Sequence, residues 1–140
     1  MSKLFFLPKR PSNCKKLFFL SLITLSTLAF GQNENLKEIQ FINAERPLQG
    51  SFGIYGSYIE VLFNSPLDGH RAFQIPIGAV DYEMAYEFSQ GDGQNFWVLH
   101  IKCKDGKGCI APTGWEELVF VISEHRERAD NVLRALKAIK

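Results

Sequence analysis

Residues 80–103 read VDYEMAYEFSQGDGQNFWVLHIKC, and the alternation of side chains along this stretch decides the fold. In the first run, from Val80 to Phe88, every second residue is apolar or aromatic, and most of the residues between them are acidic. A period of two predicts a strand with one buried face and one wet face. A glycine-rich loop follows, and a second alternating run ends at Cys103. The two runs therefore predict an antiparallel hairpin.

The two faces of this predicted hairpin differ in chemistry. The inward row contains Val80, Tyr82, Met84, Tyr86 and Phe88 in the first strand and Trp97, Leu99, Ile101 and Cys103 in the second. The outward row of the second strand contains Val98, His100 and Lys102. In either register that preserves the faces, Asp81 and Glu83 lie opposite His100, Lys102 or Lys104. We therefore expect opposite charges to meet on the outward face.

Two cysteines follow at the end of the hairpin. Cys103 and Cys109 are separated by five residues, and a second hairpin with its turn at Gly106 would place them directly across from each other. Facing residues of paired strands lie within disulfide range, and an oxidising compartment would let the bond form. We expect a structural disulfide, with two buried free thiols as the alternative. A redox-active pair is disfavoured because its usual spacing has two intervening residues.

The C-terminal part combines a strand with a helix. Residues 118–122 are apolar throughout, which predicts a strand covered on both faces. Ser123 is a suitable N-cap, and acidic residues follow it, where the helix dipole favours them. One apolar stripe at helical spacing contains Ala129, Val132, Leu133, Leu136 and Ile139. We expect this amphipathic helix to pack its stripe on the sheet.

A short helix is predicted upstream of the strands. Residues 33–48 carry Leu36, Ile39 and Ile42 at a spacing of three, which is typical of a helix. Pro47 cannot continue a helix, because it lacks the amide hydrogen and clashes with the preceding turn. The helix should therefore end before this residue.

Two further strands are predicted between this helix and the hairpin. Residues 58–64 alternate, with Ile59, Val61 and Phe63 on one face, and apolar residues also recur at every second position of residues 73–77 after a segment dense in turn formers. Pro76 lies within the second of these strands. Because proline cannot donate to a strand ladder, we expect that strand to lie at an edge or to contain a bulge.

The order of the elements predicts an α+β chain. Six or seven antiparallel strands would form a small barrel or a curled sheet, with the short N-terminal helix and the C-terminal amphipathic helix packed on it. Across residues 52–140 this order resembles the pleckstrin-homology-like barrel, from which the early helix is a departure. The early helix is similar to that of cystatin-type folds, which do not require the last helix. Fold likeness does not carry function with it.

The N-terminus has the order of a secretory signal. Residues 1–16 contain five basic residues and no acidic one, and an apolar run from Leu17 to Phe30 follows at once. As a helix, this run would rise only about 21 Å, less than the roughly 30 Å hydrocarbon core of a bilayer. We therefore expect no permanent membrane anchor. The alternative is a buried hydrophobic helix of the fold, which would leave the basic cluster unexplained.

Small residues mark a cleavage site after the apolar run. Ala29 and Gly31 stand three positions and one position before a possible cut, which would leave Gln32 as the mature N-terminus. We expect a signal peptide at residues 1–31 and one domain at residues 32–140. The sequence thus predicts export, either to a periplasm or out of the cell.

Cleavage would also change the net charge. The whole chain has a formal charge of +1, but the eleven basic and fifteen acidic residues after the predicted cut give −4. A mildly acidic domain with no stripe of Lys or Arg lacks the electrostatic surface that nucleic acids and anionic lipids require. We expect neither as a partner.

Catalytic and metal-binding motifs are not found in the sequence. His100 and Cys103 are an odd number of positions apart on one strand, so they point to opposite faces and cannot share a metal ion. His70 is expected in a loop and His125 in the first turn of the last helix, both solvated. The chain has no Gly-x-Ser-x-Gly, phosphate-binding loop or His-Glu-x-x-His motif. We expect no metal, no cofactor and no catalytic residue.

Aromatic residues among glycines are the candidate partner surface. Phe52, Tyr55 and Tyr58 near one end, and Trp115 after Pro112, lie in segments expected to be loops or edges. Tyrosine and tryptophan often anchor a partner at such positions. The alternative is that they plug the ends of a small barrel.

Three hypotheses of function follow from these patterns. The leading one is an exported, non-enzymatic binding or accessory module for an extracytoplasmic protein or a small ligand. The second is a small secreted hydrolase, which would require a pocket joining His70 or His100 to a carboxylate. The third is an inhibitor-type protein that acts through an edge strand near residues 75–77.

Overall fold

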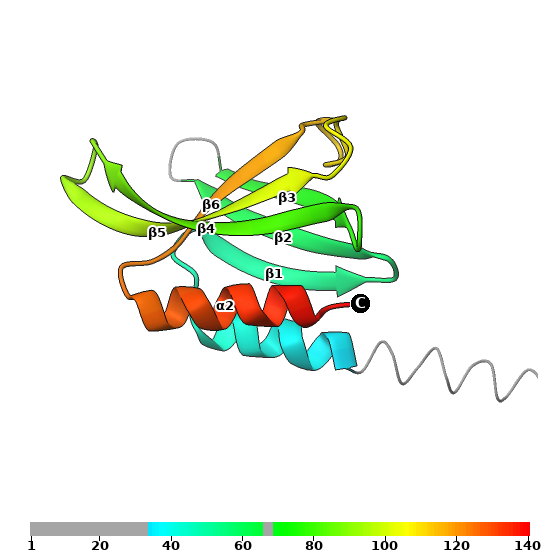
Figure 1. Cartoon of the computed structure of the whole chain (residues 1–140), viewed down its shortest axis with the longest axis horizontal. Coiled ribbons are helices and arrows are strands. Elements are labelled where there is room, and N and C mark those ends of the chain that lie inside the picture. The colour runs from blue at the N-terminus through cyan, green and yellow to red at the C-terminus, as the bar shows by residue number, and fades with distance from the viewer. Residues whose placement is uncertain (1–33, 66–68) are drawn as a thin grey trace, which may run out of the picture. The chain divides into compact units, whose positions relative to one another are not determined.

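The computed structural model describes residues 34–65 and 69–140, so the predicted signal peptide lies outside the described residues. These residues belong to a compact unit that runs Gln32–Lys140. As predicted, the described chain is α+β, with two helices and six antiparallel strands (Figure 1). In chain order the elements are a helix at 34–44, β1 (Gly50–Tyr55), β2 (Tyr58–Ser65), β3 (Gly69–Pro76), β4 (Val80–Ser89), β5 (Gln94–Cys103), β6 (Glu117–Ser123) and α2 (Arg126–Ala138).

The first sheet has the order β1-β2-β3. β2 confirms the strand predicted from alternation, since Ile59 and Val61 are buried and Glu60 between them is not. Gly56 has φ 57°, a left-handed conformation that favours glycine, in the tight turn between β1 and β2. Pro76 is the last residue of β3, which is an edge strand of this sheet, as its missing amide hydrogen predicted.

The second sheet has the order β4-β5-β6 and contains the predicted hairpin. Asp81 lies opposite Lys102 and Glu83 opposite His100, which confirms that opposite charges meet on the outward face. The expectation that β6 is covered on both faces is wrong, because Val119 is 44% exposed. Only one face of this sheet is covered, so alternate residues of its edge strand lie at the surface.

The segment just before β1 connects the two sheets. The Leu48 amide donates to the Ile122 carbonyl at 2.9 Å, and the Gln49 amide donates to the Val121 carbonyl at 3.3 Å. The chain therefore runs along the free side of β6 before it enters the first sheet. The described strands form two three-stranded sheets and no closed barrel, and the likeness to the pleckstrin-homology-like barrel stays a prediction.

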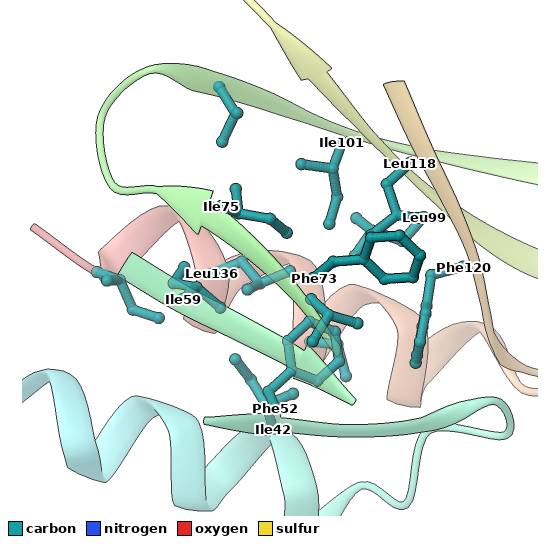
Figure 2. Close-up of a cluster of buried hydrophobic side chains, with 14 of the residues drawn as sticks. Ile42, Phe52, Ile59, Phe73, Ile75, Leu99, Ile101, Leu118, Phe120 and Leu136 are labelled. Carbon is teal, nitrogen blue, oxygen red and sulfur yellow. The ribbon is translucent and has the colours of Figure 1, made fainter. Parts of the chain in front are cut away.

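Both helices contribute to a core between the sheets (Figure 1). The stripe of α2 is buried at Ala129, Val132 and Leu136, as predicted. Phe120 of β6 is fully buried and makes edge-to-face contacts with Phe52 at 5.3 Å and with another ring of the first sheet at 5.8 Å between ring centroids. Figure 2 shows these side chains from both sheets meeting with those of the helices.

The predicted helix boundaries are only partly correct. The first helix ends at residue 44, three positions before Pro47. α2 starts at Arg126 with His125 at the N-cap position, so Ser123 is not its N-cap. The Ser123 hydroxyl instead accepts a hydrogen bond from the His125 amide at 2.9 Å. Ser123 still belongs to β6, and the helix begins only after the chain has left the sheet.

Candidate partner-binding surface

The predicted aromatic surface is divided in the structure. Tyr55 and Tyr58 face each other at the ends of β1 and β2 and are 66% and 44% exposed. Phe52 is only 3% exposed and packs on Phe120, so its assignment to a partner surface is wrong. The residue belongs to the inner row of β1, because an even number of positions separates it from Ile54, which also packs against the core.

Trp115 lies in the long loop between β5 and β6. Its ring stacks on Phe73 of β3 with 5.3 Å between centroids, and it is 43% exposed. Its carbonyl accepts hydrogen bonds from the amides of Cys109 and Ile110, both at 3.2 Å. Trp115 therefore covers one side of the core with one face of its ring and leaves only part of the ring for a partner.

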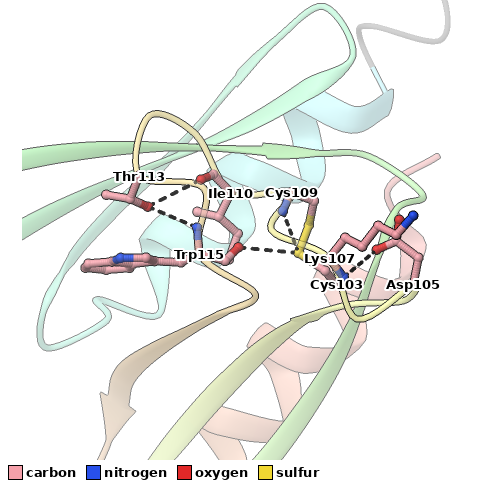
Figure 3. Close-up of a disulfide and its surroundings, with 7 residues drawn as sticks. All are labelled: Cys103, Asp105, Lys107, Cys109, Ile110, Thr113 and Trp115. Atoms are coloured by element: carbon pink, nitrogen blue, oxygen red, sulfur yellow. Dashed lines mark hydrogen bonds between the residues drawn. A yellow bond between two sulfur atoms is a disulfide. The ribbon is translucent and has the colours of Figure 1, made fainter.

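The same loop contains the predicted disulfide. Cys103 and Cys109 are bonded, with 5.9 Å between their Cα atoms (Figure 3). The loop is not the second hairpin that the sequence predicted, because β6 begins only at Glu117. Instead, Ala111 exchanges two backbone hydrogen bonds with Gln74 of β3, at 2.8 and 3.0 Å. The disulfide thus fixes the base of a loop that lies along the edge of the first sheet.

A second aromatic group lies at the far end of the β4–β5 hairpin. Tyr86 and Trp97 are directly opposite each other, with 4.9 Å between ring centroids, and Phe88 follows on the same face. Tyr86 is 55% and Phe88 63% exposed, although both were predicted to be buried. The Arg126 guanidinium lies 5.7 Å from the centre of the Trp97 ring, where a cation is attracted by the π-face. We call Tyr86, Phe88 and Trp97 the hairpin-end cluster.

The position of α2 explains why this cluster is exposed. The helix begins at Arg126, and in Figure 1 the tip of the β4–β5 hairpin extends beyond that start. Ten strand residues span about 33 Å, whereas thirteen helical residues span about 20 Å. The face that is core at Val80 therefore continues as uncovered surface at Phe88. A contiguous group of exposed apolar side chains is a candidate interaction surface.

The outward face of the same hairpin carries a charged network around His100. The Nδ1 atom lies 2.6 Å from a Glu117 oxygen, and the Nε2 atom lies 2.5 Å from a Glu87 oxygen. Both ring nitrogens can donate only when the imidazole is protonated. Burial alone would lower the pKa of His100, but the hydrogen bonds to Glu117 and Glu87 outweigh it and raise this pKa above 6.5.

The neighbouring outward positions complete this face. Lys102 donates to a Glu83 carboxylate oxygen at 3.0 Å. Val98, which was expected to point into solvent, is 5% exposed because it lies between Ala85 of β4 and Val121 of β6. The outward face thus joins a small apolar patch to a predominantly acidic row.

This arrangement offers little for acid–base chemistry. Both nitrogens of His100 are occupied by carboxylates, so neither is available to a substrate or a nucleophile. His70 lies at the surface, 2.6 Å from the Asn64 side chain. Burial raises the pKa of Tyr82 to about 12, further from neutral pH than the ordinary value of 10. Among the described residues, no group of three or more His, Cys, Asp or Glu side chains could hold a metal ion.

An open groove lies on the helical side of the molecule. It has a volume of about 520 Å³ and is lined by both helices, with Phe41 on one side and Ala138 on the other. Lys37, Glu38 and Arg134 give its rim charges of both signs. No histidine is among its lining residues, so it does not supply the pocket that the hydrolase hypothesis requires.

Comparisons with known proteins give no relatives. No protein-family model, curated protein or solved structure matches the chain. Within residues 34–65 and 69–140, no helix is long and apolar enough to span a bilayer.

Proposed function

We propose that this chain is an exported, non-enzymatic binding module whose partner contacts the hairpin-end cluster. The observation that carries the proposal is the exposure of Tyr86 and Phe88 on the same strand face that forms the core elsewhere. Ordered aromatic side chains on a rigid strand lose little conformational entropy on binding and offer a large apolar area. The partner is therefore an extracytoplasmic protein or a ligand with a substantial apolar surface.

Two features support export. The Cys103–Cys109 bond is of a kind that persists in oxidising compartments. The basic and apolar order of residues 1–31 is that of a secretory signal. A pleckstrin-homology-like arrangement remains our proposed architecture, and it adds nothing to the choice of partner.

A binding role agrees better with the chemistry than a hydrolase does. The histidine that contacts carboxylates, His100, uses both of its ring nitrogens in those contacts. The inhibitor hypothesis placed its contact on the edge strand near residues 75–77, but the backbone of Gln74 in that strand is already paired with Ala111. The exposed aromatic end of β4 is free of both objections.

Photo-crosslinking in the cells that make the protein tests this proposal. A photoreactive phenylalanine analogue would replace Phe88 in one strain, Tyr55 in a second and Lys107 in a third, since all three positions are exposed. We expect a discrete crosslinked species from position 88 that is absent from position 107. A second version that also carries Tyr86→Ser should lose most of that species.

Three outcomes would contradict the proposal. Equal crosslinking at positions 88 and 107 would indicate random collisions. No crosslinking at any position would show that no partner contacts these surfaces. Crosslinking at Tyr55 alone would move the partner to the β1–β2 turn, the other exposed aromatic surface.

A further inference from the structure

The backbone groups of β4 point alternately towards β5 and towards the free edge. The Lys104 amide donates to the Ala79 carbonyl at 3.0 Å, and these residues continue the register in which Val80 faces Cys103. The Ala79–Lys104 pair is therefore a hydrogen-bonded one. Along an antiparallel ladder, hydrogen-bonded pairs alternate with pairs that are not hydrogen-bonded. It follows that residues 81, 83, 85 and 87 bond β5, whereas residues 82, 84, 86 and 88 direct their N–H and C=O groups outward.

Each of the other edges of the two sheets has a hydrogen-bonded partner along part of its length. On β1, the Asn43 side chain donates to the Phe52 carbonyl and accepts from its amide, both at 2.8 Å. β3 is paired with Ala111, and β6 is paired with residues 48–49. Among the described residues, no group is hydrogen-bonded to the outward backbone groups of residues 82–88 of β4. A strand edge whose backbone groups are unpaired is a template for a further strand.

The two faces that flank this edge have opposite character. The inner row of β4 contains Tyr82, Met84, Tyr86 and Phe88, and its outer row contains Asp81, Glu83, Ala85 and Glu87. With Glu117 of β6, the outer face of the sheet has four carboxylates near Lys102 and His100. The acidic side chains exceed the basic ones even when the imidazole is protonated. Cross-strand neighbours of opposite charge are favourable, and those of like charge are not.

We propose that β4 accepts, as an added strand, an extended segment of another exported protein in which apolar residues alternate with Lys or Arg. This inference rests on the proposed binding function and specifies how the partner is recognised. Main-chain bonds to residues 82–88 hold the segment, its apolar side chains pack beside the hairpin-end cluster, and its basic side chains lie beside Asp81, Glu83 and Glu87. Addition of a strand to a sheet edge is a recurrent mode of peptide recognition.

A second copy of this chain is a poor occupant of the same edge. An antiparallel β4–β4 pair would bring the outer row of one copy beside the same row of the other, so that Asp81, Glu83 and Glu87 face like charges. Each such pair is destabilising. The acidic row therefore favours a basic partner and opposes self-association.

Titration calorimetry with synthetic peptides tests the proposal on the purified protein. The first peptide alternates valine and lysine over the length of β4. In the second, glutamate replaces each lysine, and the third has the composition of the first in an order without a period of two. We expect only the first peptide to bind. Equal binding by the scrambled peptide would show attraction by charge alone, and binding by the glutamate peptide would overturn the assigned chemistry.

Two variants at position 86 separate the backbone from the side chain. Tyr86→Val removes the ring and keeps the outward amide, whereas Tyr86→Pro removes both and leaves the ladder to β5 unbroken. We expect Tyr86→Pro to bind the lysine peptide at least about tenfold more weakly than Tyr86→Val. Far-ultraviolet circular dichroism and melting temperature establish that both variants are folded. Equal affinities of two folded variants would refute strand addition.

The two proposals fail differently. If position 88 crosslinks in cells while Tyr86→Pro and Tyr86→Val bind alike, the binding function stands and strand addition is wrong. If position 88 does not crosslink and the two variants bind alike, both proposals are wrong. Sedimentation of the peptide-free protein should show a monomer, and a dimer that Tyr86→Pro abolishes would assign the edge to a second copy instead.

Discussion

Loss of the Cys103–Cys109 bond should destabilise the domain by an amount that its loop length sets. The two cysteines are six positions apart, and in the chain-entropy account so short a loop contributes about 2 kcal/mol. Reduction removes this constraint and keeps both sulfur atoms. The double variant Cys103→Ala, Cys109→Ala also removes the buried sulfur of Cys103, which adds about 1 kcal/mol. We therefore expect reduction to lower the free energy of unfolding by about 2 kcal/mol, and the double variant to lower it by about 3 kcal/mol.

Urea unfolding followed by tryptophan fluorescence measures both losses. The wild type is unfolded with and without a reductant, and the double variant is unfolded alongside as a control that the reductant should not affect. For a domain of this size, a loss of about 2 kcal/mol lowers the melting temperature by roughly 8 °C. Identical unfolding of the oxidised and reduced wild type would refute the reasoning, since the loop would then be held by its other contacts.

Three further predictions follow. Phe120→Ala should lower the free energy of unfolding by about 3–5 kcal/mol, because the ring is fully buried, whereas Val119→Ala on the exposed face should cost less than about 1 kcal/mol; similar losses in urea unfolding would contradict the core. The raised pKa of His100 means that its protonated ring stabilises the fold below pH 6.5 and loses this effect as the pH rises through the folded-state pKa. His100→Gln should therefore be more destabilising at pH 5.5 than at pH 9, and an equal penalty at both would count against the ion pairs. Intact mass of the protein recovered from culture medium and cell envelope should correspond to a chain that begins at Gln32, and a full-length cytosolic chain with free thiols would contradict export.

The hairpin strands and the meeting of their opposite charges could be predicted because two independent signals agree. Alternation assigns each residue of Val80–Ser89 to a face, and opposite charges meet on the outward face in either register that preserves the faces, so the choice between those registers comes from the structure. The disulfide followed from spacing, although the hairpin invoked for it does not exist. What brings Cys109 close to Cys103 is a loop anchored on β3, and such long-range contacts leave no local periodicity.

The candidate site could not be predicted in the same way. Alternation places Tyr86 and Phe88 on the core face, but it does not say how far along the hairpin the covering helix reaches. The prediction that Val98 is exposed was wrong because the neighbours that bury it come from β4 and β6. The contrast between β4 and the other edge strands could not be predicted either. Asn43, residues 48–49 and Ala111 bond the edges of β1, β6 and β3, and none of these groups is adjacent in sequence to the strand that it bonds.

Amide hydrogen exchange along β4 tests the proposed binding edge most directly. In the free protein, the amides of residues 82, 84, 86 and 88 should exchange rapidly, while those of residues 83, 85 and 87 are protected by β5. Addition of the alternating lysine peptide should protect the first set without changing the second. Slow exchange of the first set in the free protein, or no change on addition of the peptide, would contradict the account.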